Sequence, residues 1–177
     1  MLLIQLTGLS GAGKTTISKL AQTALEGQGL RVAVLDGDEF RQHLCKDLGF
    51  SRADRIENIR RIGIVGSLLA SHGIIAIMAA INPYEEARQL VRALGVNVRT
   101  VFVDCPVGVA EQRDVRGLYR RAHLPEDDPG HLKHFTGVSD PFEIPSNPDL
   151  VIHTASESPE RSSQQLVDFV VRTVRNL

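Results

Sequence analysis

Several kinds of residue are scarce in this 177-residue chain, and each scarcity excludes a class of protein. There is no tryptophan, only two cysteines, and aromatic residues make up 5% of the sequence. Cys45 and Cys105 lie far apart and in no metal-binding or redox spacing, so we expect two free thiols, as is usual in a reducing cytoplasm. The 20 basic and 21 acidic residues nearly cancel, which leaves no electrostatic footprint for nucleic acid or an anionic membrane.

Long apolar runs are also missing. The richest one, residues 73–81, is far shorter than the ~20 residues that a membrane-spanning helix needs. The apolar residues 1–6 have no basic start and no cleavage site, so they are predicted to form a strand and not a signal peptide. We expect one domain over residues 1–177, because 42% hydrophobic residues in a chain of this length can bury a sizeable core.

Short β-branched segments alternate with segments of helical periodicity, which is typical of a parallel sheet covered by helices. Helices are expected between the first two strands, from Ser51, over residues 85–94, and from Ser158 with Pro159 in the first turn. The predicted strands are residues 2–6, 31–35, 74–81, 98–103 and 150–153. The sequence therefore predicts an α/β protein with a five-stranded parallel sheet between helical layers.

One segment breaks this alternation. Residues 124–147 contain four prolines, two glycines and many charges. A loop this long inside a compact domain is usually disordered or a functional lid. We expect a mobile lid over approximately residues 117–148.

A phosphate-binding motif follows the first predicted strand and opens the first helix. The pattern G-x-x-x-x-G-K-[ST] is satisfied by Gly8, Leu9, Ser10, Gly11, Ala12, Gly13, Lys14 and Thr15, with Thr16 next. Its backbone N–H groups would point at phosphate oxygens, and the helix dipole would favour the anion. Lys14 is expected to reach the β- and γ-phosphates of ATP, and the hydroxyl of Thr15 to ligate Mg²⁺. A glycine-rich connection with no ligand is the alternative.

Two carboxylates, Asp36 and Asp38, follow the second strand, at the sheet edge where ligands bind in α/β proteins. They could position metal-bound water or accept a proton from an attacking hydroxyl, or they could belong to a simple Asp-Gly turn. Nearby, Arg41 and Arg55 could hold an anionic substrate with their guanidinium forks, and Asn58 shares the helix face of Arg55. A solvated basic surface is the ordinary alternative.

Within the predicted lid, Lys133 places a cation beside the aromatic ring of Phe135. The ring could stack on a purine when the loop closes and excludes water. It could equally pack onto the surface of the domain.

Together these residues make the chain similar to the adenylyl-sulfate kinase (APS kinase) family, over nearly its whole length. The residues that carry the resemblance are 8–16, 35–38, Arg41, 47–51, 54–61, 81–84, 103–106, 111–115, 117–119, 135–137 and 140–141. The resemblance implies a three-layer P-loop kinase fold, commonly a homodimer. It also implies transfer of the γ-phosphoryl group of ATP to the 3′-hydroxyl of adenylyl sulfate, giving PAPS and ADP in sulfate assimilation.

The resemblance also implies roles for individual residues. Asp38 would orient or deprotonate the acceptor hydroxyl, Asp36 would support the metal with Thr15, and Lys14 completes the catalytic set. Arg113 would face the nucleotide. The substrate would be held by Arg41, Arg55, Asn58, Ile81 and Lys133, with its adenine between Phe50 and Phe135.

One position departs from the family. The family pattern often has Ile-Ser-Pro, with that serine proposed as a phosphorylated intermediate, whereas this chain has Asn82. An amide cannot carry the phosphoryl group, but direct in-line transfer needs no covalent intermediate.

Three other interpretations stay open at this point. The first is a different small-metabolite or nucleoside-monophosphate kinase, against which the block 54–61 argues. The second is a nucleotide-binding regulatory module, although its N-K-x-D base-specificity motif is missing from the sequence. The third, prompted only by Asn82, is a catalytically weakened relative.

Overall fold

Five short aliphatic segments form one sheet in the computed structural model, which describes residues 2–114 and 116–177. The strands are β1 (Leu2–Thr7), β2 (Val32–Asp36), β3 (Ile75–Ala79), β4 (Asn97–Asp104) and β5 (Leu150–His153). All neighbours are parallel, in the order β2-β3-β1-β4-β5. Every residue of the two central strands β1 and β3 is buried, because helices cover both faces of the sheet. The five predicted strands are confirmed, although β3 is shorter than expected.

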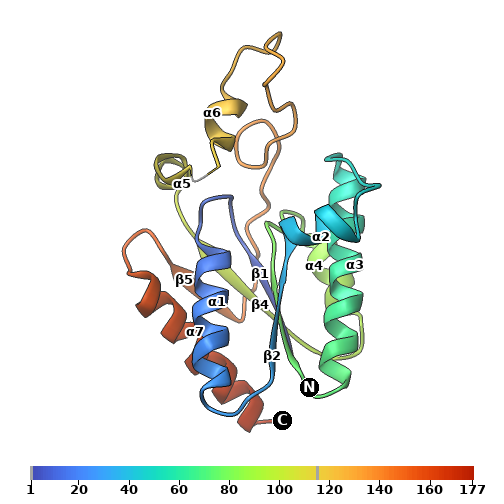
Figure 1. The fold of residues 1–177 in the computed structure, drawn as a ribbon, viewed down its shortest axis with the longest axis vertical. Helices are drawn as coiled ribbons and strands as arrows, with labels where there is room; N and C mark the ends of the chain where they lie inside the picture. Colours follow the sequence, from blue (N-terminus) through green and yellow to red (C-terminus); the bar gives the residue numbers. More distant parts are fainter. Residues whose placement is uncertain (1, 115) are drawn as a thin grey trace.

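Two helical layers flank the sheet, as Figure 1 shows. One contains α1 (Lys14–Glu26) and α7 (Pro159–Arg175), and the other contains α3 (Arg52–Ser71) and α4 (Glu85–Arg92). Each layer has its own core: Ile17 and Leu166 pack with one face of β1, and Ile62 and Val91 pack with the other. The three-layer α/β/α prediction is confirmed.

Capping residues define where the long helices begin. The side chain of Ser51 accepts a hydrogen bond from the backbone N–H of Asp54, and that of Ser158 accepts one from Arg161. Pro159 occupies the first turn of α7, where its missing N–H costs nothing. Both predicted helix starts are confirmed.

Three short helices were not predicted, because five to seven residues are too few to show helical periodicity. They are α2 (Gly37–His43), α5 (Val107–Arg113) and α6 (Leu118–Ala122). Asp36 caps α2, since its carboxylate accepts the N–H of Asp38 at 2.9 Å. The predicted lid therefore begins with a helix, whereas residues 123–149, all of them described, contain no helix or strand besides a single bridge between Thr136 and Asp140.

The helices α5 and α6 and the lid loop rise above the carboxyl ends of the strands, whereas the C-terminus lies at the opposite end of the molecule (Figure 1). In an open α/β sheet, ligands bind outside the carboxyl ends of the strands. Within the described ranges, no helix combines the length and the apolar character needed to cross a membrane.

Candidate active site

The predicted phosphate cradle lies between β1 and α1, at the carboxyl edge of the sheet. Its backbone requires glycine at two points. A Cβ atom at Gly8 would lie 2.5 Å from the carbonyl oxygen of Val103, and Gly13, which precedes α1, has a left-handed φ of 95°. Residues of the cradle then line a cavity of about 660 Å³, into which the first turn of α1 also projects.

Lys14 is buried at the base of this cavity. Its ammonium group donates hydrogen bonds to the carbonyl oxygens of Gly8 at 2.9 Å and Leu9 at 2.7 Å. Burial lowers the pKa of Lys14 to about 8, although the carboxylates of Asp38 and Asp36 oppose this effect. A partly desolvated cation at this position favours an anionic ligand, because the ligand restores the interactions that water no longer supplies.

Thr15 and Asp36, the two residues predicted to hold Mg²⁺, contact each other. The hydroxyl of Thr15 donates to Asp36 Oδ2 at 2.8 Å, so two oxygen ligands from different elements lie together beside the cradle. Oxygen donors suit Mg²⁺, which usually binds one or two protein groups together with substrate phosphates and water. These residues therefore fit the ion that the sequence motif implies.

Asp38 faces the same cavity from the first turn of α2. Its carboxylate pairs with the guanidinium of Arg116 at 2.5 Å, and both side chains are about half exposed. Arg116 lies between α5 and α6, at the base of the lid. The residue predicted as the base thus lines the cavity and contacts a residue at the base of the predicted lid, while its backbone N–H also bonds Asp36 as in an Asp-Gly turn.

The guanidinium groups of Arg41 and Arg55 both lie close to the ring of Phe50. Their guanidinium carbons lie 4.6 Å and 5.5 Å from the centre of the Phe50 ring. Burial lowers the pKa of each arginine, and for Arg41 the neighbouring charge of Arg55 adds to this effect. Arg41 is half-buried and Arg55 is buried, so these two cations lie closer together and less solvated than on an ordinary basic surface, an arrangement that suits an anionic ligand.

Arg55 is also tied to the lid. Its guanidinium donates to the carbonyl oxygens of Phe50 at 3.0 Å and of His134 at 2.5 Å, and lies 3.8 Å from the carboxylate of Asp140. One turn further along α3, Asn58 lines the cavity and is buried. None of the described residues donates a hydrogen bond to its Oδ1 atom.

Arg113, the last residue of α5, lines the cavity beside the phosphate cradle. It donates to the carbonyl oxygen of Thr154 at 2.6 Å and to that of Gly11 at 3.3 Å. Tyr119 of α6 reaches the cradle too, since its hydroxyl donates to the carbonyl oxygen of Ser10 at 3.0 Å. The lid base is therefore fastened to the phosphate cradle at two points.

The structure brings most of the predicted site residues to this one cavity but not all of them. Phe135 is buried and packs edge-on against Tyr119, with the ring centres 4.9 Å apart. In this conformation its ring packs onto the domain, which was the second of the two expectations for it. Lys133 is exposed on the lid, and neither it, Phe50 nor Phe135 is among the cavity-lining residues. The predicted residues that line the cavity are Ser10, Gly11, Gly13, Lys14, Thr15, Thr16, Asp38, Arg41, Arg55, Asn58, Ile81 and Arg113.

Sequence reasoning assigned no role to Arg116, Tyr119 or Thr154. Thr154 directly follows β5, and the rule that ligands bind at the carboxyl ends of strands could have indicated it. Tyr119 belongs to residues 117–119, which resemble the family, whereas Arg116 lies just before them, and nothing local in the sequence shows which partners either residue meets.

A five-stranded parallel sheet between helical layers, with a phosphate cradle between β1 and α1 at its carboxyl edge, defines the P-loop kinase fold. A family model described as adenylylsulphate kinase matches residues 1–153. The chain belongs to this family.

Individual relatives agree with this assignment. The adenylyl-sulfate kinase of Synechococcus sp. (strain JA-3-3Ab) is 51% identical over 170 residues, which cover 96% of this chain and 92% of the relative. The solved structure of the Mycobacterium tuberculosis APS kinase CysC, in complex with AMPPNP and APS, has a TM-score of 0.89 and 39% identity, covering 95% of this chain and 96% of the other. A hexameric APS kinase from Thiobacillus denitrificans has a TM-score of 0.69 and 32% identity, covering 97% of this chain but 29% of that one.

Proposed function

We propose that this protein is an adenylyl-sulfate kinase, which transfers the γ-phosphoryl group of ATP to the 3′-hydroxyl of adenylyl sulfate. A bond forms between the 3′-oxygen and the γ-phosphorus while the bond from that phosphorus to the β-bridging oxygen breaks. The products are 3′-phosphoadenylyl sulfate (PAPS) and ADP, and the hydroxyl proton passes to a carboxylate. The reaction serves sulfate activation.

The observation that carries this proposal is that one cavity is lined by residues of the phosphate cradle, by Asp38 and by the two arginines Arg41 and Arg55. Lys14 lines it from α1, Asp38 and Arg41 from α2, and Arg55 from α3. A donor triphosphate and an anionic acceptor could thus occupy neighbouring positions, which is the arrangement that in-line phosphoryl transfer needs.

Each residue then has a defined task. Asp38 accepts or orients the hydroxyl proton, and Lys14 neutralises charge on the transferred group. The phosphosulfate and sugar of the acceptor are held by Arg41, Arg55 and Asn58, and the backbone of Ile81 lies beside the acceptor. When the lid closes, the acceptor is also contacted by Phe50, Phe135 and Lys133.

The donor side has its own residues. The nucleotide is bound by Arg113 and residues 8–16. Thr15 and Asp36 would hold Mg²⁺, which neutralises phosphate charge when it is bound.

The comparisons support this choice over its rivals. The M. tuberculosis neighbour binds an ATP analogue together with APS, at 39% identity over nearly the whole of both chains. A nucleoside monophosphate is also anionic, so the arginines alone do not separate the two kinase classes; the family match over residues 1–153 and the 51% identical adenylyl-sulfate kinase favour adenylyl sulfate as the acceptor. A regulatory module would not need a carboxylate at the junction of donor and acceptor.

The proposal is tested by mixing the purified chain, ATP, Mg²⁺ and adenylyl sulfate and following ADP formation. Parallel reactions with AMP, CMP or UMP as acceptor provide the comparison. We expect ADP and PAPS only with adenylyl sulfate. Turnover of a monophosphate without turnover of adenylyl sulfate would assign the chain to the rival kinase class, and no stimulation by any acceptor would favour the regulatory module.

We further propose that residues 1–177 act as one domain with residues 117–148 as its mobile lid, in the cytoplasm, as a homodimer. The two cysteines are free and buried, which agrees with a reducing compartment. The T. denitrificans relative is an assembly of several copies, although a hexameric one. Sedimentation velocity at micromolar concentration would distinguish a dimer from a monomer or a larger assembly.

A further inference from the structure

Asn82, the residue that stands where the family often has serine, adopts an unusual backbone conformation. Its φ angle is 47°, and among the described residues it is the only non-glycine residue in the left-handed region. Asparagine tolerates this region better than most residues with a side chain. Asn82 follows β3, is 1% exposed and lines the cavity together with its neighbours Ile81 and Pro83.

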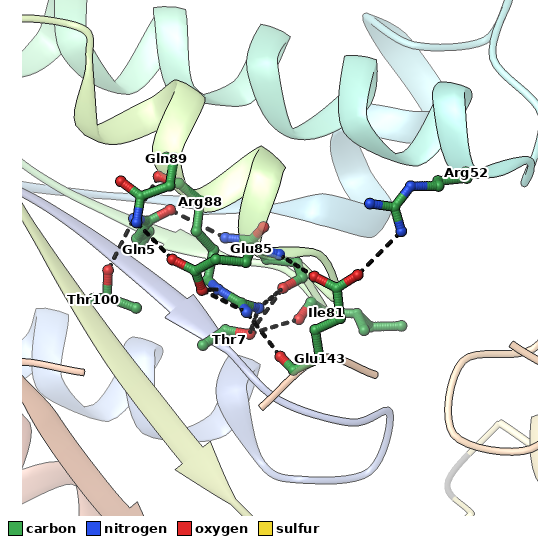
Figure 2. A network of polar contacts seen from close by, with 10 residues as sticks. Gln5, Thr7, Arg52, Ile81, Glu85, Arg88, Gln89, Thr100 and Glu143 are labelled. Atoms are coloured by element: carbon green, nitrogen blue, oxygen red, sulfur yellow. Dashed lines mark hydrogen bonds and ion pairs between the residues drawn. The ribbon is translucent and has the colours of Figure 1, made fainter. Parts of the chain in front are cut away.

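The orientation of the Asn82 amide is determined by a buried hydrogen-bond network, shown in Figure 2. Gln5 in the middle of β1 donates from its Nε2 to the carbonyl oxygen of Arg88 at 3.2 Å and to Thr100 Oγ1 at 3.0 Å. A carbonyl oxygen only accepts, so the amide nitrogen of Gln5 must face Arg88 and its oxygen must face Asn82. Asn82 in turn donates from Nδ2 to that oxygen at 3.1 Å. A serine hydroxyl is too short to span this gap.

The backbone of the same turn is fastened to the start of the phosphate cradle. The N–H of Gly8 donates to the carbonyl oxygen of Ile81 at 3.1 Å. The hydroxyl of Thr7 lies 2.9 Å from the carbonyl oxygen of Asn82 and 3.2 Å from that of Ile81 (Figure 2). The turn after β3 and the cradle after β1 are thus held at one relative position.

Arg88 extends this connection to the root of the lid. It is 1% exposed and donates to the carbonyl oxygens of Asn82 at 2.9 Å and of Glu143 at 2.8 Å, and it pairs with Glu85 at 2.8 Å. Glu143 also contacts the turn after β3 directly, because its backbone N–H donates to the carbonyl oxygen of Pro83 at 2.8 Å. Thr7, Gly8, Arg88 and Glu143 thus all bond backbone carbonyl oxygens of residues 81–83, which line the cavity.

We propose that Asn82 is a positioning residue for phosphoryl transfer: held by Gln5, it sets the acceptor-side wall at residues 81–83 against the first residue of the phosphate cradle. The inference rests on the proposed function for the identity of the acceptor. It replaces the catalytic role that has been suggested for the family serine with a geometric one. The expected consequence is that the donor nucleotide binds without Asn82 but is badly aligned with the acceptor.

Two single variants separate the amide from the backbone conformation. Asn82→Gly keeps the left-handed turn and removes the amide, and Gln5→Met removes the partner while Asn82 stays in place. We expect each to lower kcat by about tenfold or more, because small misplacements of reacting groups are costly. We expect the KM for ATP and the Kd for ADP to be unchanged within error. The double variant should be no slower than the slower single variant, because both remove the same hydrogen bond.

Asn176→Gly, at the exposed end of α7, serves as the matched control and should keep the wild-type rate. Thermal unfolding followed by circular dichroism defines a temperature at which every variant is folded. Wild-type kcat in the folded Asn82→Gly variant would overturn the proposal, because the amide would then be merely structural. Equal losses in ADP affinity and in kcat would also overturn it, since Asn82 would then be supporting the cradle itself.

Calorimetric binding of adenylyl sulfate in the presence of ADP gives a readout without turnover. We expect Asn82→Gly to bind adenylyl sulfate several-fold more weakly than the wild type. The wild-type rate tests the proposed function, whereas the ratio of variant to wild type tests the role of Asn82. A wild-type protein that binds adenylyl sulfate without turning it over would refute only the former, and equal affinities in both proteins would refute only the latter.

Discussion

Nucleotide binding to this protein is predicted to take up a proton at mildly alkaline pH, through Lys14. Burial lowers the pKa of its ammonium group to about 8 in the nucleotide-free chain. Phosphate oxygens beside the ammonium should return this pKa to its ordinary value of 10.5 or above, since nearby negative charge favours the protonated form. Between pH 8 and 10.5, the free protein therefore lacks a proton that the complex holds.

The size of the effect follows from the pKa of the free protein. Proton uptake should be about 0.1 at pH 7, about 0.5 at pH 8 and about 0.9 at pH 9. Because ATP binds the protonated form of Lys14, the free-energy cost of taking up this proton weakens binding as the pH rises, and the affinity for ATP should be about tenfold weaker at pH 9 than at pH 7, or ~1.4 kcal/mol. Neither quantity depends on the identity of the acceptor.

Isothermal titration calorimetry measures both. ATP with Mg²⁺ is titrated into the protein at each pH in two buffers of different ionisation enthalpy, and the difference in apparent enthalpy reports the protons taken up. Lys14→Met is the control, because it keeps a long side chain but has no titrating group. If the wild type shows no proton uptake and constant affinity between pH 7 and pH 9, the ammonium is not desolvated and the reasoning is wrong.

Three further predictions concern activity and stability. Asp38→Asn should lower transfer by roughly 10²–10⁴-fold while ATP affinity measured by calorimetry is retained, and a variant at full rate would remove Asp38 from the mechanism. Lys14→Met should raise the free energy of unfolding at pH 7 by up to ~3 kcal/mol. The folded-state pKa of Lys14 lies below the unfolded value, so its penalty is complete below pH 8 and is relieved towards pH 10.5, which urea unfolding across this range checks. Hydrogen bonds from Arg60 and then Arg61 lower the pKa of Glu57 to about 2, so this carboxylate stabilises the fold above about pH 4.5 and loses its effect towards pH 2. Glu57→Gln should therefore cost less than ~1 kcal/mol at pH 7, because the carboxylate is partly exposed, and nothing near pH 2; an equal cost at both would contradict this.

Features set by neighbouring residues were predictable from the sequence. The cradle at residues 8–16 follows from the spacing of its glycines and Lys14, and the starts of α3 and α7 follow from Ser51 and Ser158, which bond N–H groups three residues away. The five strands follow from aliphatic runs that must be buried. In each case the residues that interact are near one another in the chain, so their pattern is visible in the sequence.

The short helices and the lid contacts were not predictable in this way. Helix α6 has five residues, and Phe135 packs against Tyr119 because a lid loop with no other helix or strand folds back onto that helix. The hydrophobic patterns used for long helices contain no information at this length. Purine stacking and packing onto the domain both require one aromatic residue at position 135. The sequence therefore does not distinguish these two roles of Phe135.

The chemical groups of the site can be read from the sequence alone: a cradle for phosphates, carboxylates at a strand end, and arginines on a helix. Which of these groups contact one another depends on the folded structure. Asp38 pairs with Arg116 across 78 positions of the chain, and Asn82 bonds Gln5 with a sequence separation of 77. Such contacts arise from strand order and helix packing, which bring distant residues together only when the whole core forms. Local residue patterns therefore specify the parts of this site, and the packing of the sheet specifies their geometry.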